Sequence, residues 1–428
     1  MYRFKPRDIN VVLISAYFVV GYAVKIDQIE GLLPGAQFIP LGILIVGGGN
    51  LFIRSIARKP FGLFPVRLRL FYVYIAVSLV LLVAVNLNAL RPTYSIFRVI
   101  VSVGILALSI IFFWQALQVI ETTKMRRGRL LTYSLLTLLI ILLLGQLTIP
   151  EWATGIGGIR MSGGSNPNQL AFMAFFAIFW AHYSTLKKRA WERAEVYLYV
   201  VSLVVLAWSL SRSVILTWIS LYFIYFAIAG VLHFAQLLRG RVRLSVLRKI
   251  VATGVFCLLL VPAIPTLEKT VYILQDFQKI EQRLSGESGL QSRIRAWKDI
   301  WPYFTEFPIT GRAGWWNSTN VNSRVGGRMT ATSPHNLFVR LLSESGIIGL
   351  ISVLLLPFTV IIMLFLRLLS QRLSSNKFFV LLFAMASLIS VLVGQLFEDR
   401  YMVGVGGIDS GIIYFILVCA INEILKKE

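Results

Sequence analysis

Residues that could bind metals, form disulfides or carry out acid–base chemistry are scarce in this chain. The 428 residues include two cysteines and three histidines, and charged residues make up 14% of the composition. Cys257 and Cys419 both lie in apolar segments, and their spacing does not resemble a ligand set, so we expect neither a disulfide nor a metal site. With 57% hydrophobic residues, the composition excludes a soluble globular protein.

The excess of basic residues does not indicate a nucleic-acid-binding protein. Lys and Arg number 42 against 19 Asp and Glu, which gives a net charge of +23. These basic residues occur in short clusters between apolar runs, as is typical of the loops that join membrane-spanning helices. We therefore expect membrane lipids as partners and no nucleic acid.

Twelve apolar runs approach the roughly 20 residues that a helix needs to cross a bilayer. They lie at about residues 10–24, 35–53, 70–89, 99–119, 130–149, 168–184, 196–210, 213–232, 250–266, 346–366, 378–396 and 410–424. The first run follows a basic start and has no small-residue cleavage site, so we interpret it as a retained span. We predict an all-α polytopic membrane protein of about 12 transmembrane helices, with residues 1–428 as a single integral membrane domain.

The distribution of basic residues predicts the orientation. With the N-terminus inside, the inner segments hold 26 Lys and Arg, whereas the short outer segments hold six. Positive residues favour the cytoplasmic side. We therefore expect both termini in the cytoplasm and the long segment 267–334 on the outer side of the membrane.

This large loop, between spans 9 and 10, is predicted to be mostly helical. Residues 268–284 and 290–304 have helical patterns, and the second has apolar residues at a spacing of three or four, a stripe suited to the bilayer surface. The stripe consists of Ile294, Trp297, Trp301 and Phe304. The loop tryptophans, which also include Trp315 and Trp316, have two possible roles, contact with glycan and anchoring in the membrane interface.

The stretch that begins at Ser333 is the main candidate site. We expect Ser333 to cap a helix that starts at Pro334, which places His335 and Asn336 in its first turn, where a helix favours anions. At 3.6 residues per turn, Gly346 and Gly349 share a stripe with His335, against which another segment can pack closely. In the predicted topology His335 is the one histidine on the outer side. The alternative is a capping histidine in a loop before a transmembrane helix.

Outer arginines suggest a site for phosphate groups. Arg212 is the only fully charged residue between Glu195 and Arg239, at a tight outer turn, so it is either functional or a snorkelling arginine that marks the hairpin. Arg160 precedes a Gly- and Asn-rich stretch ending at Asn168, whose asparagines have an alternative role as helix caps.

Outside the cytoplasmic membrane there is no ATP, so an enzyme there needs a substrate that is already activated and anchored in the membrane. A polyprenyl diphosphate-linked sugar fits, because its leaving group is a diphosphate and one planar guanidinium group can bind two phosphate oxygens at once. The available outer arginines are Arg212, Arg293, Arg312 and Arg160. His335 is the candidate base for an attacking hydroxyl. The outer loops have no Asp-x-Asp cluster, so we predict no metal and no cofactor.

The ordered set of motifs resembles the O-antigen ligase and polymerase superfamily of bacterial envelope glycosyltransferases. The ligase signature appears without a departure: His335-Asn336, nine residues, Gly346, two residues and Gly349. Other matches are Arg160 before Asn166-Pro167-Asn168, then Ser211-Arg212, and Ser292-Arg293 with Trp297, Pro308 and Gly311, so that the resemblance covers roughly residues 150–365. Arg312-Ala313-Gly314 departs from the usual Gly-x-Gly, which puts the role of Arg312 in doubt.

The resemblance implies a protein of the bacterial cytoplasmic (inner) membrane, with segment 267–334 and the active site facing the periplasm. It also implies a metal-independent, inverting transfer of glycan from an undecaprenyl diphosphate-linked donor on that side. His335 would be the base, Arg212 and Arg293 would hold the diphosphate with Arg312 and Arg160 as weaker candidates, and Asn336, Gly346, Gly349 and Asn168 would support the site. The acceptor would be lipid A core in a ligase, which the intact signature favours, or a second lipid-linked glycan in a polymerase. A lipid-linked sugar transporter or flippase is the non-enzymatic alternative, although the sequence shows no two-half symmetry.

Overall fold

The computed structural model describes sixteen stretches of the chain. These are residues 9–23, 39–47, 109–110, 112–114, 116–121, 128–149, 153–154, 160–163, 166–238, 290–309, 311, 322–325, 328–331, 335–369, 374–398 and 408–425.

Helices dominate the described residues, as predicted. The labelled helices are α1 (Ile9–Ala23), α6 (Gly128–Thr148), α7 (Pro167–Lys188), α8 (Arg193–Ser209), α9 (Arg212–Leu238), α12 (Leu290–Glu306), α13 (Leu337–Leu368), α14 (Ser375–Gly394) and α15 (Ile408–Leu425). Two short antiparallel hairpins depart from the all-α prediction. They pair β1 (Ala153–Thr154) with β2 (Arg160–Met161), and β3 (Asn322–Val325) with β4 (Arg328–Ala331).

Eight of the predicted spans coincide with α1, α6 to α9 and α13 to α15. Among the residues that the structure describes, five stretches are long and apolar enough to cross a membrane: 128–148, 167–188, 212–231, 346–368 and 376–394. The chain is therefore a helical membrane protein. The predicted spans 70–89 and 250–266 lie outside the described residues, and 35–53 and 99–119 are only partly described.

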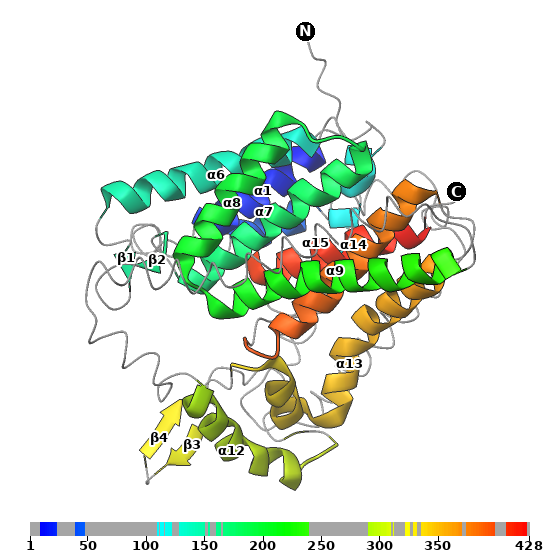
Figure 1. Cartoon of the computed structure of the whole chain (residues 1–428). Coiled ribbons are helices and arrows are strands. Elements are labelled where there is room, and N and C mark those ends of the chain that lie inside the picture. The colour runs from blue at the N-terminus through cyan, green and yellow to red at the C-terminus, as the bar shows by residue number, and fades with distance from the viewer. Residues whose placement is uncertain are drawn as a thin grey trace, which may run out of the picture.

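Helices α7 and α14 form the centre of the bundle, with α9 and α15 against them (Figure 1). In α7, 83% of the most apolar part of the helix is buried, whereas α6, α9 and α13 each bury less than half of the corresponding part. The large apolar side chains exposed on the outer helices include Ile141 and Leu147 on α6 and Ile362 and Leu366 on α13. In a bilayer such surfaces face the lipid tails, which are as apolar as the side chains themselves.

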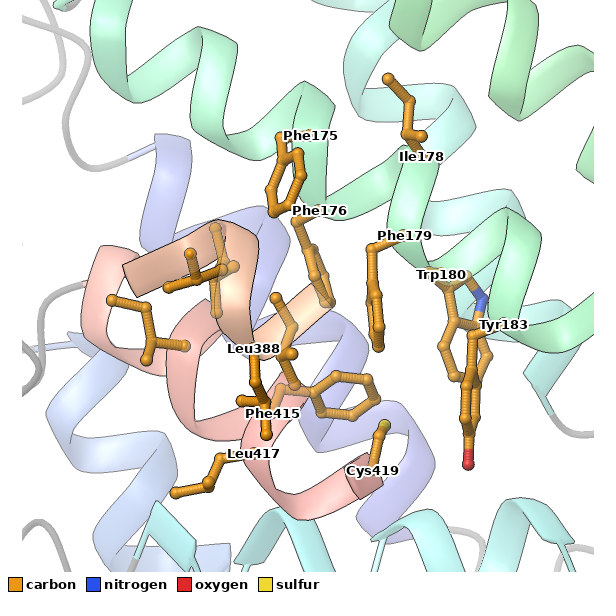
Figure 2. Packing of buried hydrophobic residues seen from close by; sticks show 14 of the residues in the cluster. Phe175, Phe176, Ile178, Phe179, Trp180, Tyr183, Leu388, Phe415, Leu417 and Cys419 are labelled. Atoms are coloured by element: carbon orange, nitrogen blue, oxygen red, sulfur yellow. The ribbon is translucent and has the colours of Figure 1, made fainter. Parts of the chain in front are cut away.

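Aromatic rings on α7 pack against α15 and α1 in the middle of the bundle. Figure 2 shows Phe176 and Trp180 of α7 beside Phe415 of α15. The Phe415 ring lies edge-on to Phe176, with ring centroids 5.4 Å apart, and 5.7 Å from Trp180. Phe18 of α1 completes the cluster at 4.4 Å from Phe176. Each such pair adds about 0.5–1.5 kcal/mol beyond burial, so the cluster fixes the relative positions of three helices.

Buried charges at the C-terminal end of α7 are paired. Lys187 Nζ lies 2.8 Å from Glu423 and 3.3 Å from Glu121, and Tyr183 donates to Glu423 at 2.8 Å. Arg367, at the end of α13, donates to the Ile424 carbonyl. Pairing offsets the cost of removing these charges from water. This end, called the basic end below, lies about 30 Å along α7 from Asn168 at its other end.

The start of α13 differs from the prediction. The helix begins at Leu337 and its N-cap is Asn336, so Ser333 is not the cap and His335 is not in the first turn. The Asn336 side chain accepts hydrogen bonds from the backbone N–H groups of Phe338 and Val339, at 2.9 and 3.1 Å. His335 has φ +46°, outside the helical range. The cap moves to Asn336 because the chain turns sharply at the residue before it.

Gly346 interrupts α13, so the predicted continuous stripe from His335 to Gly349 is wrong. Its backbone angles, φ 62° and ψ −163°, divide the helix at a kink. The carbonyls of Pro308 and Ile309 accept hydrogen bonds from the N–H groups of Ile347 and Ile348, at 2.9 and 3.2 Å, and thereby cap the second half of α13. The expected close approach at Gly346 is confirmed, because the backbone of Ile309 lies directly against it.

The described part of the large loop combines α12 with the β3–β4 hairpin, next to each other at one end of the molecule (Figure 1). The helix predicted at 290–304 is confirmed, and it packs against α13. Ile300 of this helix is fully buried, whereas Ile294 and Trp301 of the predicted stripe are exposed. The helix predicted at 268–284 lies outside the described residues.

Candidate functional site

Four helix ends meet opposite the basic end. They are the starts of α7, α9 and α13, and the turn that follows α14. The N–H of Leu337, the first residue of α13, donates to the carbonyl of Gln395 after α14 at 3.0 Å. This bond joins the His335 turn to the turn that carries Glu398, although 63 residues separate the two side chains in sequence.

Glu398 accepts hydrogen bonds from two of these helix starts. Its Oε1 accepts from Asn168 Nδ2 at 3.0 Å and from Ser213 Oγ at 3.1 Å. Its Oε2 lies 3.9 Å from His335 Nδ1. Glu398 itself is buried, and a buried carboxylate is stable only when other groups satisfy its charge. The carboxylate therefore connects α7, α9 and the residue before α13.

Asn166 and Asn168 divide the two roles considered for the asparagines before span six. Asn166 is the N-cap of α7, and its side chain accepts from the N–H of Asn168 at 2.8 Å. The Asn168 side chain bridges instead: it donates to Glu398 and accepts from Ser211 Oγ at 2.9 Å. The capping alternative therefore holds for Asn166, while the Asn168 side chain connects three elements.

Arg212 is the first residue of α9 and is exposed. Its two neighbours are buried, and each is tied to the same network, Ser211 to Asn168 and Ser213 to Glu398. The Ser-Arg-Ser turn is thus held from both sides. A guanidinium on a fixed, exposed helix start can bind an anion in a defined position.

His335 is half exposed, with 48% of its side chain accessible, and stands beside the buried Glu398. Its neighbour Asn336 is buried in its capping role. A half-exposed imidazole next to a carboxylate can accept a proton from a hydroxyl group that enters from the open side. The positions of His335 and Arg212 around one network permit base catalysis beside an anion site.

Of the other predicted site residues, some are described in full and others only in part. Gly349 is buried in the second half of α13. Arg160 lies on β2 and Arg293 on α12, but their side chains are outside the described residues, as is the whole of Arg312. Within the described residues, no group of three or more His, Cys, Asp or Glu is placed to hold a metal ion.

Sequence reasoning missed Glu398 and Ser213 as part of this arrangement. An acid just beyond an apolar span, at its outer end, is the signal in the sequence that identifies Glu398. Arg340 was also overlooked: it is a buried arginine in the first turns of α13. A charged residue inside an otherwise apolar helix is the pattern that identifies it.

A family comparison bears on the same region. Residues 197–354 match the family model described as O-antigen ligase. This match supports the O-antigen ligase-like superfamily. The resemblance inferred from the motifs is thereby confirmed. The matched segment contains His335, Gly346 and Gly349 of the O-antigen ligase-like signature, and also Arg212 and Arg293. Asn168 and Glu398 lie outside it. A comparison with curated proteins gives no match.

Proposed function

We propose that this protein is a periplasmic-side glycosyltransferase that moves a glycan from undecaprenyl diphosphate to lipid A core, as an O-antigen ligase. The observation that carries the proposal is the convergence of His335, Arg212 and Asn168, from three distant motifs, on one end of the bundle. The O-antigen ligase match over residues 197–354 supports the glycosyltransferase class, of ligase or polymerase type.

In this proposal His335 accepts the proton of the acceptor hydroxyl while that oxygen attacks the anomeric carbon from the face opposite the leaving group. The configuration inverts, and the undecaprenyl diphosphate leaves with the bonding electrons. Arg212 stabilises the charge that develops on the diphosphate. Arg293, Arg312 and Arg160 are proposed as further diphosphate contacts, so that guanidinium groups serve in place of a divalent cation.

The proposed location is the bacterial inner membrane, with both termini in the cytoplasm. The basic end of the bundle carries Lys187, Lys188 and Arg367, and the predicted inner segments contain most of the basic residues. Positive residues favour the cytoplasmic side, which directs the His335 end to the periplasm. Lipid-linked donor and lipid-anchored acceptor would both reach the site from the membrane.

The test is a transfer assay with the full chain in liposomes that contain a lipid-linked oligosaccharide and a lipid A core acceptor. We expect transfer by the wild type, no transfer by His335→Ala, and unchanged transfer after chelation of divalent ions. His233→Ala is the matched control, because His233 lies on α9 about 30 Å along the helix from Arg212. Equal activity in the His335 and His233 variants would contradict the proposal.

The acceptor identifies the reaction within the class. Replacing lipid A core by a second lipid-linked unit should abolish transfer by a ligase, whereas a polymerase would join the two units. Movement of the lipid-linked sugar between leaflets without any transfer would instead indicate a flippase.

A further inference from the structure

Glu398 is placed to do more than connect helices. It follows α14 after a tight turn in which the N–H groups of Gln395, Leu396 and Phe397 all bond back to carbonyls in the last turns of that helix. The turn therefore holds Glu398 at a fixed position relative to α14. Its carboxylate is buried beside the half-exposed imidazole of His335, so His335 is the member of the pair that solvent reaches.

The two oxygens of Glu398 have different surroundings. Oε1 accepts from Asn168 and Ser213, which fixes the plane of the carboxylate. Oε2 faces His335 Nδ1 at 3.9 Å, within ion-pair range but longer than a hydrogen bond. Catalytic hydrogen bonds are commonly long in a free enzyme and shorten when substrate binds.

The backbone of His335 supports the pairing independently of the side chains. A φ of +46° is unfavourable for a residue with a side chain and persists where surrounding contacts impose it. The hydrogen bond from Leu337 N to the Gln395 carbonyl holds the chain on both sides of this contact together. The strained turn thus directs the imidazole toward Glu398.

We propose that Glu398 is a positioning residue for His335 in the transfer reaction. In the reaction its Oε2 accepts the hydrogen of Nδ1, so that Nε2 is the ring nitrogen that takes the proton from the acceptor hydroxyl. As the new bond between the acceptor oxygen and the anomeric carbon forms, the bond from that carbon to the diphosphate breaks. The proton ends on Nε2, and the resulting imidazolium stands beside a negative charge.

The inference rests on the proposed function and extends it to a residue outside the matched segment. Asn168 and Ser213 gain a role through it, since they hold Glu398 and, together with Ser211, fix the turn that presents Arg212. One carboxylate would therefore set the distance between the base and the proposed diphosphate site.

The test compares Glu398→Gln, Glu398→Asp and His335→Ala in the liposome transfer assay. The control is Glu192→Gln, because Glu192 pairs with Lys188 at the basic end. We expect Glu398→Gln to lower kcat at least about tenfold with an unchanged KM for the donor. The amide can accept through one oxygen only, so its NH2 group faces either the Nδ1–H of His335 or the donors Asn168 and Ser213. Glu398→Asp should recover most of kcat, since it keeps the charge. Glu192→Gln should behave as the wild type.

A kcat for Glu398→Gln within twofold of wild type would overturn the inference, and so would equal losses in the Gln and Asp variants, which indicate a structural role. If Glu398→Gln does not fold, Ser213→Ala removes only one bond to Oε1; it should lower kcat about threefold without changing KM, and no loss would overturn the inference. Loss in His335→Ala with full activity in Glu398→Gln leaves the proposed function standing, whereas absence of transfer by the wild type removes both.

Discussion

Replacement of Gly346 by alanine should destabilise the protein strongly. The residue has φ 62° and ψ −163°, a conformation that is essentially restricted to glycine and costs other residues about 1–3 kcal/mol. A Cβ at this position would overlap the carbonyl carbon and oxygen of Ile309 and lie 2.7 Å from the Gly311 nitrogen. These are backbone atoms, so no side-chain rotation relieves the overlap.

Overpacking of this kind adds about 1–3 kcal/mol. Together with the backbone strain, we expect Gly346→Ala to lower the free energy of unfolding by roughly 2–6 kcal/mol. Gly230→Ala is the matched control. Gly230 lies within α9, and a Cβ there meets nothing within 4 Å. Its replacement should raise stability by up to about 1 kcal/mol, because alanine favours the helix.

The measurement is unfolding by SDS in mixed micelles, followed by circular dichroism, for the wild type and both variants. Opposite signs for the two substitutions are the expected result. If Gly346→Ala unfolds within about 1 kcal/mol of the wild type, then the kink is not a glycine-dependent break in α13 and the argument is wrong.

Three further predictions concern helix contacts, surface charge and cations. Gly394→Ala should destabilise the α9–α14 contact, since its Cβ would overlap Thr217 Oγ1, and Thr217→Ala should restore much of the loss in the double variant measured by SDS unfolding. Arg129 hydrogen-bonds to Glu192 and holds the pKa of that carboxyl below its usual value. The pair's stabilisation, less than about 1 kcal/mol at this exposed site, is therefore present above the unfolded pKa and lost as pH falls through the folded pKa. Arg129→Gln should accordingly lower stability near about pH 6, and lower it less at a pH below the folded pKa of Glu192. An equal effect under both conditions would contradict the pairing. Transfer activity should survive excess EDTA, and its loss, restored by a divalent ion, would refute the metal-free mechanism.

The apolar runs predicted α1, α6 to α9, α14 and α15 because a bilayer imposes length and hydropathy on each span separately. The length and hydropathy of a span can be read from the sequence without knowing which helices pack against it. The start of α13 shows the limit. Ser333 and Asn336 are both good caps, and the choice of Asn336 goes with a bond from Leu337 to Gln395 that no local pattern contains. The predicted stripe from His335 to Gly349 is wrong because helical periodicity assumes an unbroken helix, whereas Gly346 interrupts α13.

The sequence by itself determined the class of protein, the positions of most described helices and the O-antigen ligase-like signature, and it suggested His335 and Arg212 as candidate site residues. Only the tertiary structure decided which helix ends meet, and therefore brought Glu398 to His335 and divided the roles of Asn166 and Asn168. The physical reason is that hydropathy and capping act over a few residues, whereas a buried carboxylate is satisfied by whichever side chains packing brings within reach. Those partners come from α7, α9 and the turn before α13, which are far apart in the sequence, so no sequence spacing predicts their contact with Glu398.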